Sequence, residues 1–227
     1  MESLRVLTSL LILPLVFLSN HLFAFFFARF TGQWEGFAFF VVISLWQSLF
    51  LVGGTLYLSL GRWGMTWADL GLGPAHFRKG MKEGFSSGFF IFLLVIAGGM
   101  LVEMFYPISS AEMQPFTAVV LEASSPLQRL VLFVFGVIIA PFAEELYFRG
   151  LLFSLLREHL GLVKGVVLSG LVFGLLHFDL VRLFPLALGG MALALLYDRT
   201  GSLYAPIMAH GVWNGLMFLI LLFAPEV

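Results

Sequence analysis

Two adjacent carboxylates and an arginine lie inside a stretch of this sequence that is otherwise suited to lipid. The stretch spans residues 141–150, and its ionisable side chains are Glu144, Glu145 and Arg149. The preceding residues, 130–140, carry no charge at all. Because an ionised carboxylate is costly to bury in hydrocarbon, an ionisable residue within a membrane span is a functional-site hypothesis by default.

The spacing of these three residues predicts a division of roles. Glu145 and Arg149 are four residues apart, so on a helix they share a face and can pair. Glu144 is rotated by about 100° from Glu145 and points toward a different neighbour. We therefore expect Glu145 and Arg149 to form a neutralised supporting pair that leaves Glu144 for reaction. The alternative is that all three form one structural charge cluster.

Two later apolar stretches each contribute polar side chains at helical spacing. His177 lies four residues after Phe173, and Asn214 lies four residues after His210. A buried glutamate can accept and return a proton near neutral pH, and a histidine beside it can hold the attacking water. A second histidine and an asparagine amide can donate hydrogen bonds to a developing oxyanion. These residue types together indicate hydrolysis.

A zinc site is the alternative chemistry. Two histidines and one glutamate are a known catalytic ligand set, so His177, His210 and Glu144 are a feasible combination. The sequence lacks a His-Glu-x-x-His pair and contains no cysteine. We favour a reaction without a metal or other cofactor, because the base and the donors are all accounted for without an ion.

The composition places the protein in a bilayer. Of its 227 residues 60% are hydrophobic and only 11% are charged, with a mean hydropathy of +1.02. Soluble domains carry about 25% charged residues, so membrane lipid is the expected surrounding. The net charge of −1 offers no basic face, which argues against nucleic acid as a partner.

Apolar runs separated by charge and glycine predict one all-α integral membrane domain over residues 1–227. Period-2 alternation of the kind found in barrel strands is missing, so a polytopic bundle of transmembrane helices is expected. The fourth run is too long for a plain span, and we expect it to continue as an interfacial helix after Gly150. About seven spans are predicted, with six to eight compatible, near 4–27, 36–60, 85–105, 127–156, 162–178, 183–197 and 203–224.

The distribution of basic residues predicts the orientation in the membrane. The connection over residues 61–84 holds Arg62, Arg78, Lys79 and Lys82, whereas residues 106–126 hold no Lys or Arg. Basic loops stay in the cytoplasm, so we expect the N-terminus inside and the C-terminus outside.

Three motifs follow one another on successive predicted spans: Glu-Glu-x-x-x-Arg, Phe-x-x-x-His and His-x-x-x-Asn. In this order they resemble the CPBP intramembrane proteases, the family of the type II CAAX prenyl endopeptidases (Rce1-like) and of bacteriocin-immunity (Abi) relatives. The resemblance covers a protease core of about residues 126–216, including the segment 200–206 that precedes His210.

The resemblance implies an endopeptidase that acts on a membrane-associated peptide or protein, such as a C-terminal or juxtamembrane segment. By the family's pattern Glu144 and His177 would activate water, and His210 and Asn214 would stabilise the oxyanion. Glu145 and Arg149 would complete the first motif as support. The family has been described as metalloproteases, but its arrangement also fits a glutamate-dependent mechanism. The short, loop-poor chain suggests a bacterial cytoplasmic membrane.

Two alternative functions, each of a different class of protein, compete with that of a protease. The first is a non-catalytic immunity or scaffolding membrane protein with the same fold, against which the complete set of motifs argues. The second is a small transporter whose intramembrane glutamates and histidines relay protons. A transporter would be expected to carry an internal repeat or paired broken helices, and the sequence shows neither.

Overall fold

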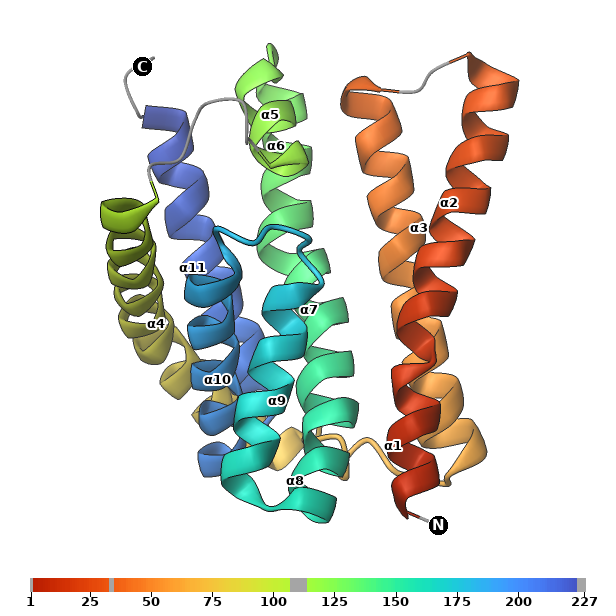
Figure 1. The fold of residues 1–227 in the computed structure, drawn as a ribbon, viewed down its shortest axis with the longest axis vertical. Coiled ribbons are helices and arrows are strands. Elements are labelled where there is room, and N and C mark those ends of the chain that lie inside the picture. Colours follow the sequence, from red (N-terminus) through yellow and green to blue (C-terminus); the bar gives the residue numbers. More distant parts are fainter. Residues whose placement is uncertain (1, 33–34, 107–113, 224–227) are drawn as a thin grey trace.

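The computed structural model describes residues 2–32, 35–106 and 114–223, and within them all regular secondary structure is helical. The predicted all-α class is therefore confirmed. The helical runs lie side by side along the long axis of the molecule, with the N-terminus at one end and the C-terminus at the other (Figure 1). Large apolar side chains such as Phe30 and Met104, which are 86% and 78% exposed, point outward. The fully buried side chains include Arg149 and Glu145. This inverted pattern suits a lipid solvent.

The first two runs form a hairpin at one side of the bundle (Figure 1, red and orange). Helices α1 (Glu2–Leu10) and α2 (Ile12–Thr31) make one nearly continuous run. Pro14, near the start of α2, has no N–H to continue the hydrogen-bond ladder. Helix α3 (Gly36–Leu56) returns and ends in a wide π turn, η1 (Tyr57–Arg62).

Helix α4 packs along helix α11 through a row of glycines. A 3₁₀ turn, η2 (Pro74–His76), leads into α4 (Phe77–Phe105), and α11 spans Tyr204–Phe223. Gly80, Gly84 and Gly88 recur every four residues on the buried face of α4. A Cβ on Gly88 would lie 2.7 Å from the carbonyl oxygen of Ala209. The missing side chains let the two helix backbones approach closely.

The run that carries the glutamate pair is long and alternates between two helical pitches. Ser125 and Gln128 form a capping box at its start, just after the short helix α5 (Pro115–Glu122). The run extends from Pro126 to Leu160, so the predicted continuation past Gly150 is confirmed. Its parts are α6 (Pro126–Val134), the π turn η4 (Phe135–Ile139), α7 (Ala140–Glu145), the π turn η5 (Leu146–Phe153) and α8 (Ser154–Leu160).

Helices α9 (Leu162–Leu175) and α10 (Leu183–Thr200) complete the core. They pack on each other at Gly170 and Gly174, where a Cβ would lie 2.8 Å from the carbonyl oxygens of Ala187 and Leu183 respectively. Small residues at this Gly-x-x-x-Gly spacing let two helix backbones approach closely.

Five runs of the described residues are long and apolar enough to cross a membrane. Helix α9 is a shorter apolar helix, and α10 returns beside it, so about seven passages is the right description. The predicted boundaries differ most at α4, whose helix begins at Phe77 although its apolar stretch begins only near residue 85. The basic residues of its first turns extend the helix beyond the apolar part.

Candidate active site

Glu145 is the central acceptor of the site. It lies at the end of α7 and its side chain is fully buried. Its Oε1 accepts a hydrogen bond from Arg149 Nη1 at 2.8 Å, so the expected i,i+4 ion pair is present. The same oxygen lies 2.8 Å from Nδ1 of His210 on α11. One carboxylate oxygen therefore holds both a guanidinium on its own helix and an imidazole on another.

The buried guanidinium of Arg149 makes three kinds of contact, although its Nε has no hydrogen-bond partner. Besides Glu145, its Nη2 donates to the carbonyl oxygen of Gly190 on α10 at 2.8 Å. Its Cζ lies 4.8 Å from the ring centroid of Phe173 and 5.6 Å from that of Phe148. Such charge pairing and cation–π contact are what a fully buried arginine needs. Arg149 thus joins η5, α9 and α10.

His210 has a defined orientation because Glu145 fixes one of its ring nitrogens. A carboxylate only accepts, so Nδ1 carries the hydrogen and donates it. The other nitrogen, Nε2, lies 4.0 Å from Oε2 of Glu144. The ring stacks on Trp213 at 5.2 Å and meets the edge of Phe173 at 5.7 Å. His210 is held between two adjacent glutamates, with Nε2 on the side of Glu144.

The two glutamates differ in their access to the surroundings. The side chain of Glu145 has no exposed area, whereas that of Glu144 is 29% exposed. The rotation between neighbouring helical positions separates them, as the spacing predicts. Glu144 can therefore meet water or a ligand, while Glu145 can act only through the residues it contacts.

His177 lies just after the end of α9, where it is exposed. Its Nδ1 bonds the carbonyl oxygen of Phe173 at 2.9 Å. Since a carbonyl only accepts, Nδ1 carries the hydrogen, and in the neutral ring Nε2 keeps its lone pair. The ring centroid lies 5.0 Å from that of Phe173, which also contacts His210. Phe173 therefore lies against both histidines.

A pocket of about 440 Å³ opens beside His177. It is lined by the loop that follows α9 and by residues at the start of α5, including Asp179 and Gln114. Asp179 accepts from the backbone N–H groups of Val181 and Arg182 and pairs with the Arg182 guanidinium, so the loop has a fixed turn. The pocket gives His177 contact with the surroundings of the bundle.

Asn214 contacts a carbonyl that the helix itself leaves without a donor. In η4 the N–H of Ala140 bonds the carbonyl of Phe135, five residues earlier. The next bond in this register would run from Pro141 to Gly136, but proline has no N–H. Asn214 Nδ2 donates to that Gly136 oxygen at 2.9 Å. This bond uses one of its two amide hydrogens.

Sequence reasoning named all the polar side chains of this cluster but missed the backbone groups that hold them. The carbonyls of Gly136 and Gly190 were not foreseen, nor was the ring of Phe173 as a platform for Arg149. Pro141, placed five residues after Gly136, is a signal that could have indicated an orphaned carbonyl. Gly190 and the Phe173 contact carry no comparable signal, because they depend on how separate helices pack.

The structure also tests the fit of a metal. In the part of the chain that the structure describes, no three His, Asp or Glu side chains come together as a possible ligand group. His177, His210 and Glu144 do not form such a group within the described residues, and the ring of Phe173 contacts both histidine rings. As arranged, these residues do not fit the alternative zinc set.

The fold and the site define a polytopic helical membrane protein with a partly open polar site inside the bundle. Residues 126–216 match the family model described as type II CAAX prenyl endopeptidase Rce1-like. This match contains all six site residues predicted from the sequence, from Glu144 to Asn214, and confirms the resemblance inferred from the motifs.

A curated protein also matches part of the chain. The chain is 35% identical over 77 residues to the Bacillus subtilis (strain 168) protein named "Putative membrane peptidase YdiL". The match covers 34% of this chain and spans 32%, about a third, of the length of that relative. No solved structure matches the chain.

Proposed function

We propose that this protein is an intramembrane endopeptidase that hydrolyses a peptide bond of a membrane-associated peptide or protein. The observation that carries the proposal is His210, which bonds Glu145 through Nδ1 and turns Nε2 toward the accessible Glu144. The Rce1-like match over residues 126–216 and the name of the B. subtilis relative support the same activity.

In the proposed reaction Glu144 is the general base. A water held by Glu144 and by Nε2 of His177 gives a proton to Glu144, while its oxygen attacks the carbonyl carbon of the scissile bond. The pocket beside His177 supports this role, because it brings the ring into contact with the surroundings. When the tetrahedral intermediate collapses, Glu144 returns the proton to the leaving amine.

His210 and Asn214 stabilise the oxyanion in this scheme. Because Nδ1 of His210 is already donating to Glu145, Nε2 can donate only when the ring is protonated. Asn214 uses one amide hydrogen on Gly136 and has a second for the oxyanion. Glu145 and Arg149 act as positioning residues that never touch the substrate.

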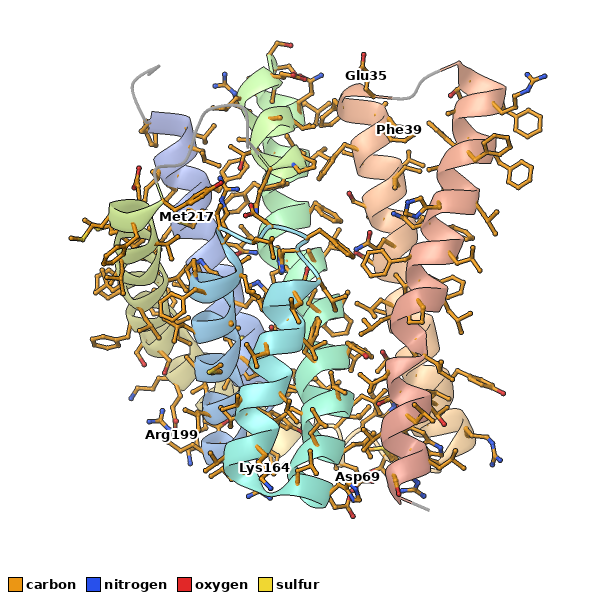
Figure 2. All side chains as sticks on the ribbon, viewed as in Figure 1. Glu35, Phe39, Asp69, Lys164, Arg199 and Met217 are labelled. Atoms are coloured by element: carbon orange, nitrogen blue, oxygen red, sulfur yellow. The ribbon has the colours of Figure 1, made fainter. Side chains whose placement is uncertain are left out.

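The proposed location is a bacterial cytoplasmic membrane with the N-terminus inside. Lys164 and Arg199 lie at the same end of the bundle as the N-terminus, and Glu35 lies at the opposite end (Figure 2). Basic residues gather on the cytoplasmic side, which supports this orientation. The proposed substrate is a C-terminal or juxtamembrane segment, which can reach a site inside the bundle without unfolding a whole domain.

Cleavage by the purified protein tests the proposal. We expect detergent-solubilised wild type to cleave members of a library of membrane-associated peptides, and Glu144→Gln to lower the rate at least about 10²-fold. This substitution keeps the shape of the side chain and removes proton transfer. The matched control is Glu103→Gln, an exposed glutamate near the end of α4. Full activity of Glu144→Gln would eliminate the proposed base, and no cleavage by wild type would favour the immunity or scaffolding alternative.

His177→Ala can be compared with a histidine in the same local geometry. Nδ1 of His21 also bonds the carbonyl four residues earlier, that of Phe17, at 2.8 Å on the exposed side of α2. We expect His177→Ala to remove activity and His21→Ala to retain it. Equal effects would mean that the histidine–carbonyl bond matters only for folding.

We also propose that catalysis needs no metal or other cofactor. Glu144 as the base and the amide of Asn214 as a donor fill hydrolytic roles without an ion, and an amide is a good hydrogen-bond donor but a poor zinc ligand. The test is the metal content of active protein together with its activity after extensive chelation. Stoichiometric zinc that is lost and restored together with activity would overturn this mechanism.

A further inference from the structure

An apolar groove runs along the outer side of the α1–α3 hairpin, away from the candidate active site. Its volume is about 580 Å³, and it lies between α1 and α2 on one side and α3 with η1 on the other. All the side chains that line it are uncharged, and nearly all its surface is apolar. Leu15, Leu49 and Tyr57 are more than half exposed along it. We call this feature the hairpin groove.

The length of the hairpin groove corresponds to one leaflet of a bilayer. On the α3 side its lining extends from Trp46 to Leu58. These twelve helical steps span about 18 Å. Half of a hydrocarbon core of about 30 Å is about 15 Å. The α3 wall of the groove is therefore about as long as one leaflet of the hydrocarbon core.

Two arginines stand at the other end of the groove. Arg5 lies one helical turn before Thr8, which lines the groove, and Arg62 lies about one turn after Leu58. Both arginines are exposed. The guanidinium of Arg5 lies 5.5 Å from the ring centroid of Trp63, so these two chain segments meet. The groove is thus apolar along its length and basic at its membrane-surface end.

We propose that the hairpin groove binds one anionic phospholipid, with an acyl chain along the groove and the phosphate between Arg5 and Arg62. Charge complementarity favours this occupant over a transmembrane helix of a partner, which would leave both arginines unneutralised. The length of one leaflet favours it too, because a spanning helix would cover the hairpin from end to end. The inference is independent of the proposed peptidase activity.

Glycine at position 53 permits a direct test. A Cβ on Gly53 would meet no atom within 4 Å, and this residue lines the groove. A side chain at position 53 therefore begins in open space, and Gly53→Phe is the substitution chosen to fill the groove. Gly99→Phe is the matched control, because Gly99 on α4 is equally open and does not line the groove.

The assay is native mass spectrometry of detergent-purified protein titrated with phosphatidylglycerol or phosphatidylcholine of the same chains. We expect wild type to prefer phosphatidylglycerol. A basic residue near an anionic headgroup contributes about 1 kcal/mol, or about fivefold in affinity, so Arg5→Gln with Arg62→Gln should remove most of this preference. Gly53→Phe should lower the affinity for both lipids at least about tenfold. Two control variants should bind both lipids as wild type does: Gly99→Phe on α4, and Arg29→Gln at the opposite end of the hairpin.

A second measurement covers the case in which a variant folds poorly. Brominated acyl chains quench tryptophan, and Trp46 lines the inner end of the groove. In wild-type protein, brominated phosphatidylglycerol should quench fluorescence saturably in a phosphatidylcholine background, and Trp46→Phe should abolish the saturable part. The proposal is overturned if this quenching is unsaturable, or if the headgroup preference survives loss of both arginines. It is also overturned if Gly53→Phe binds lipid normally, or if it dissociates an oligomer instead.

Discussion

A single oxygen atom links the ionisable side chains of the candidate site. Oε1 of Glu145 accepts from both Arg149 and His210, and all three side chains are nearly or fully buried. Removing one partner of a buried pair is costly because the other charge stays behind without compensation. The site should therefore respond more strongly to loss of Arg149 than any surface ion pair would.

We predict that Arg149→Met lowers the free energy of unfolding by about 3–5 kcal/mol, because it keeps the apolar stem and leaves Glu145 charged and buried. The control is Arg157→Met on the same run of helix. Arg157 pairs with Asp198 but is 51% exposed, so its loss should cost at most about 1 kcal/mol. Thermal or denaturant unfolding in detergent measures both. Equal stability of the two variants would contradict a supporting role for the pair.

Replacing Asn214 is predicted to have two separable effects, one on stability and one on the cleavage rate. Asn214→Ala leaves the Gly136 carbonyl without a donor, which costs about 1–3 kcal/mol of stability. If Asn214 also donates to the oxyanion, the rate per folded molecule should fall by about 10²–10³. Cleavage rates normalised to the folded fraction separate the two. Asn20→Ala is the control, because Asn20 bonds Gln47 within the α2–α3 hairpin. A loss of stability alone would show that Asn214 serves only the helix.

The side chains of the site could be predicted from the sequence because polar residues are rare in a chain of this composition. Glu145 and Arg149 could also be paired, because both belong to one helix and their spacing determines their geometry. The bond between Glu145 and His210 could not be foreseen. It joins residues 65 positions apart, and it depends on the way α11 packs against α7.

At the scale of the elements, the glycine row of α4 determines where α11 lies. A Cβ on Gly84 would overlap the carbonyl of Ala205, and one on Gly88 would lie 2.7 Å from both the Ala209 oxygen and Val212 Cβ. Because α11 carries His210 and Asn214, this contact positions half of the candidate site. The sequence predicts the helices themselves from their apolar runs. It does not predict the π turns η4 and η5, because apart from Arg149 the apolar runs continue through both turns without a break in composition.

We predict that Gly88→Ala lowers the free energy of unfolding by about 1–3 kcal/mol, the usual effect of forcing an extra methyl group into a packed contact. It should also lower the cleavage rate, because α11 must move to make room. Gly99→Ala on the same helix has open space around its Cβ and should be neutral or slightly stabilising. Unfolding and activity measurements on both variants check this. If Gly88→Ala behaved like Gly99→Ala, the glycine row of α4 would not determine the position of α11.

At the scale of the whole molecule, the charges predict how the bundle sits in the membrane. The absence of native cysteine makes single-cysteine labelling straightforward. We expect Ala75→Cys, before α4, to react with an impermeant maleimide only after cells are opened. Glu35→Cys, at the opposite end of the hairpin, should react in intact cells (Figure 2). The reverse pattern would place the N-terminus outside.

The shortness of α9 has a consequence for the surrounding bilayer. Its 14 residues rise about 21 Å, less than the hydrocarbon thickness of about 30 Å, so the polar loop after it lies below the level of the headgroups. Irregular backbone at that depth is tolerated only beside water. The lipid around α9 must therefore thin, or water must descend to His177. Either way, hydrophobic mismatch becomes part of the protein's function. Turnover should fall in membranes of longer acyl chains, which cover that loop more deeply.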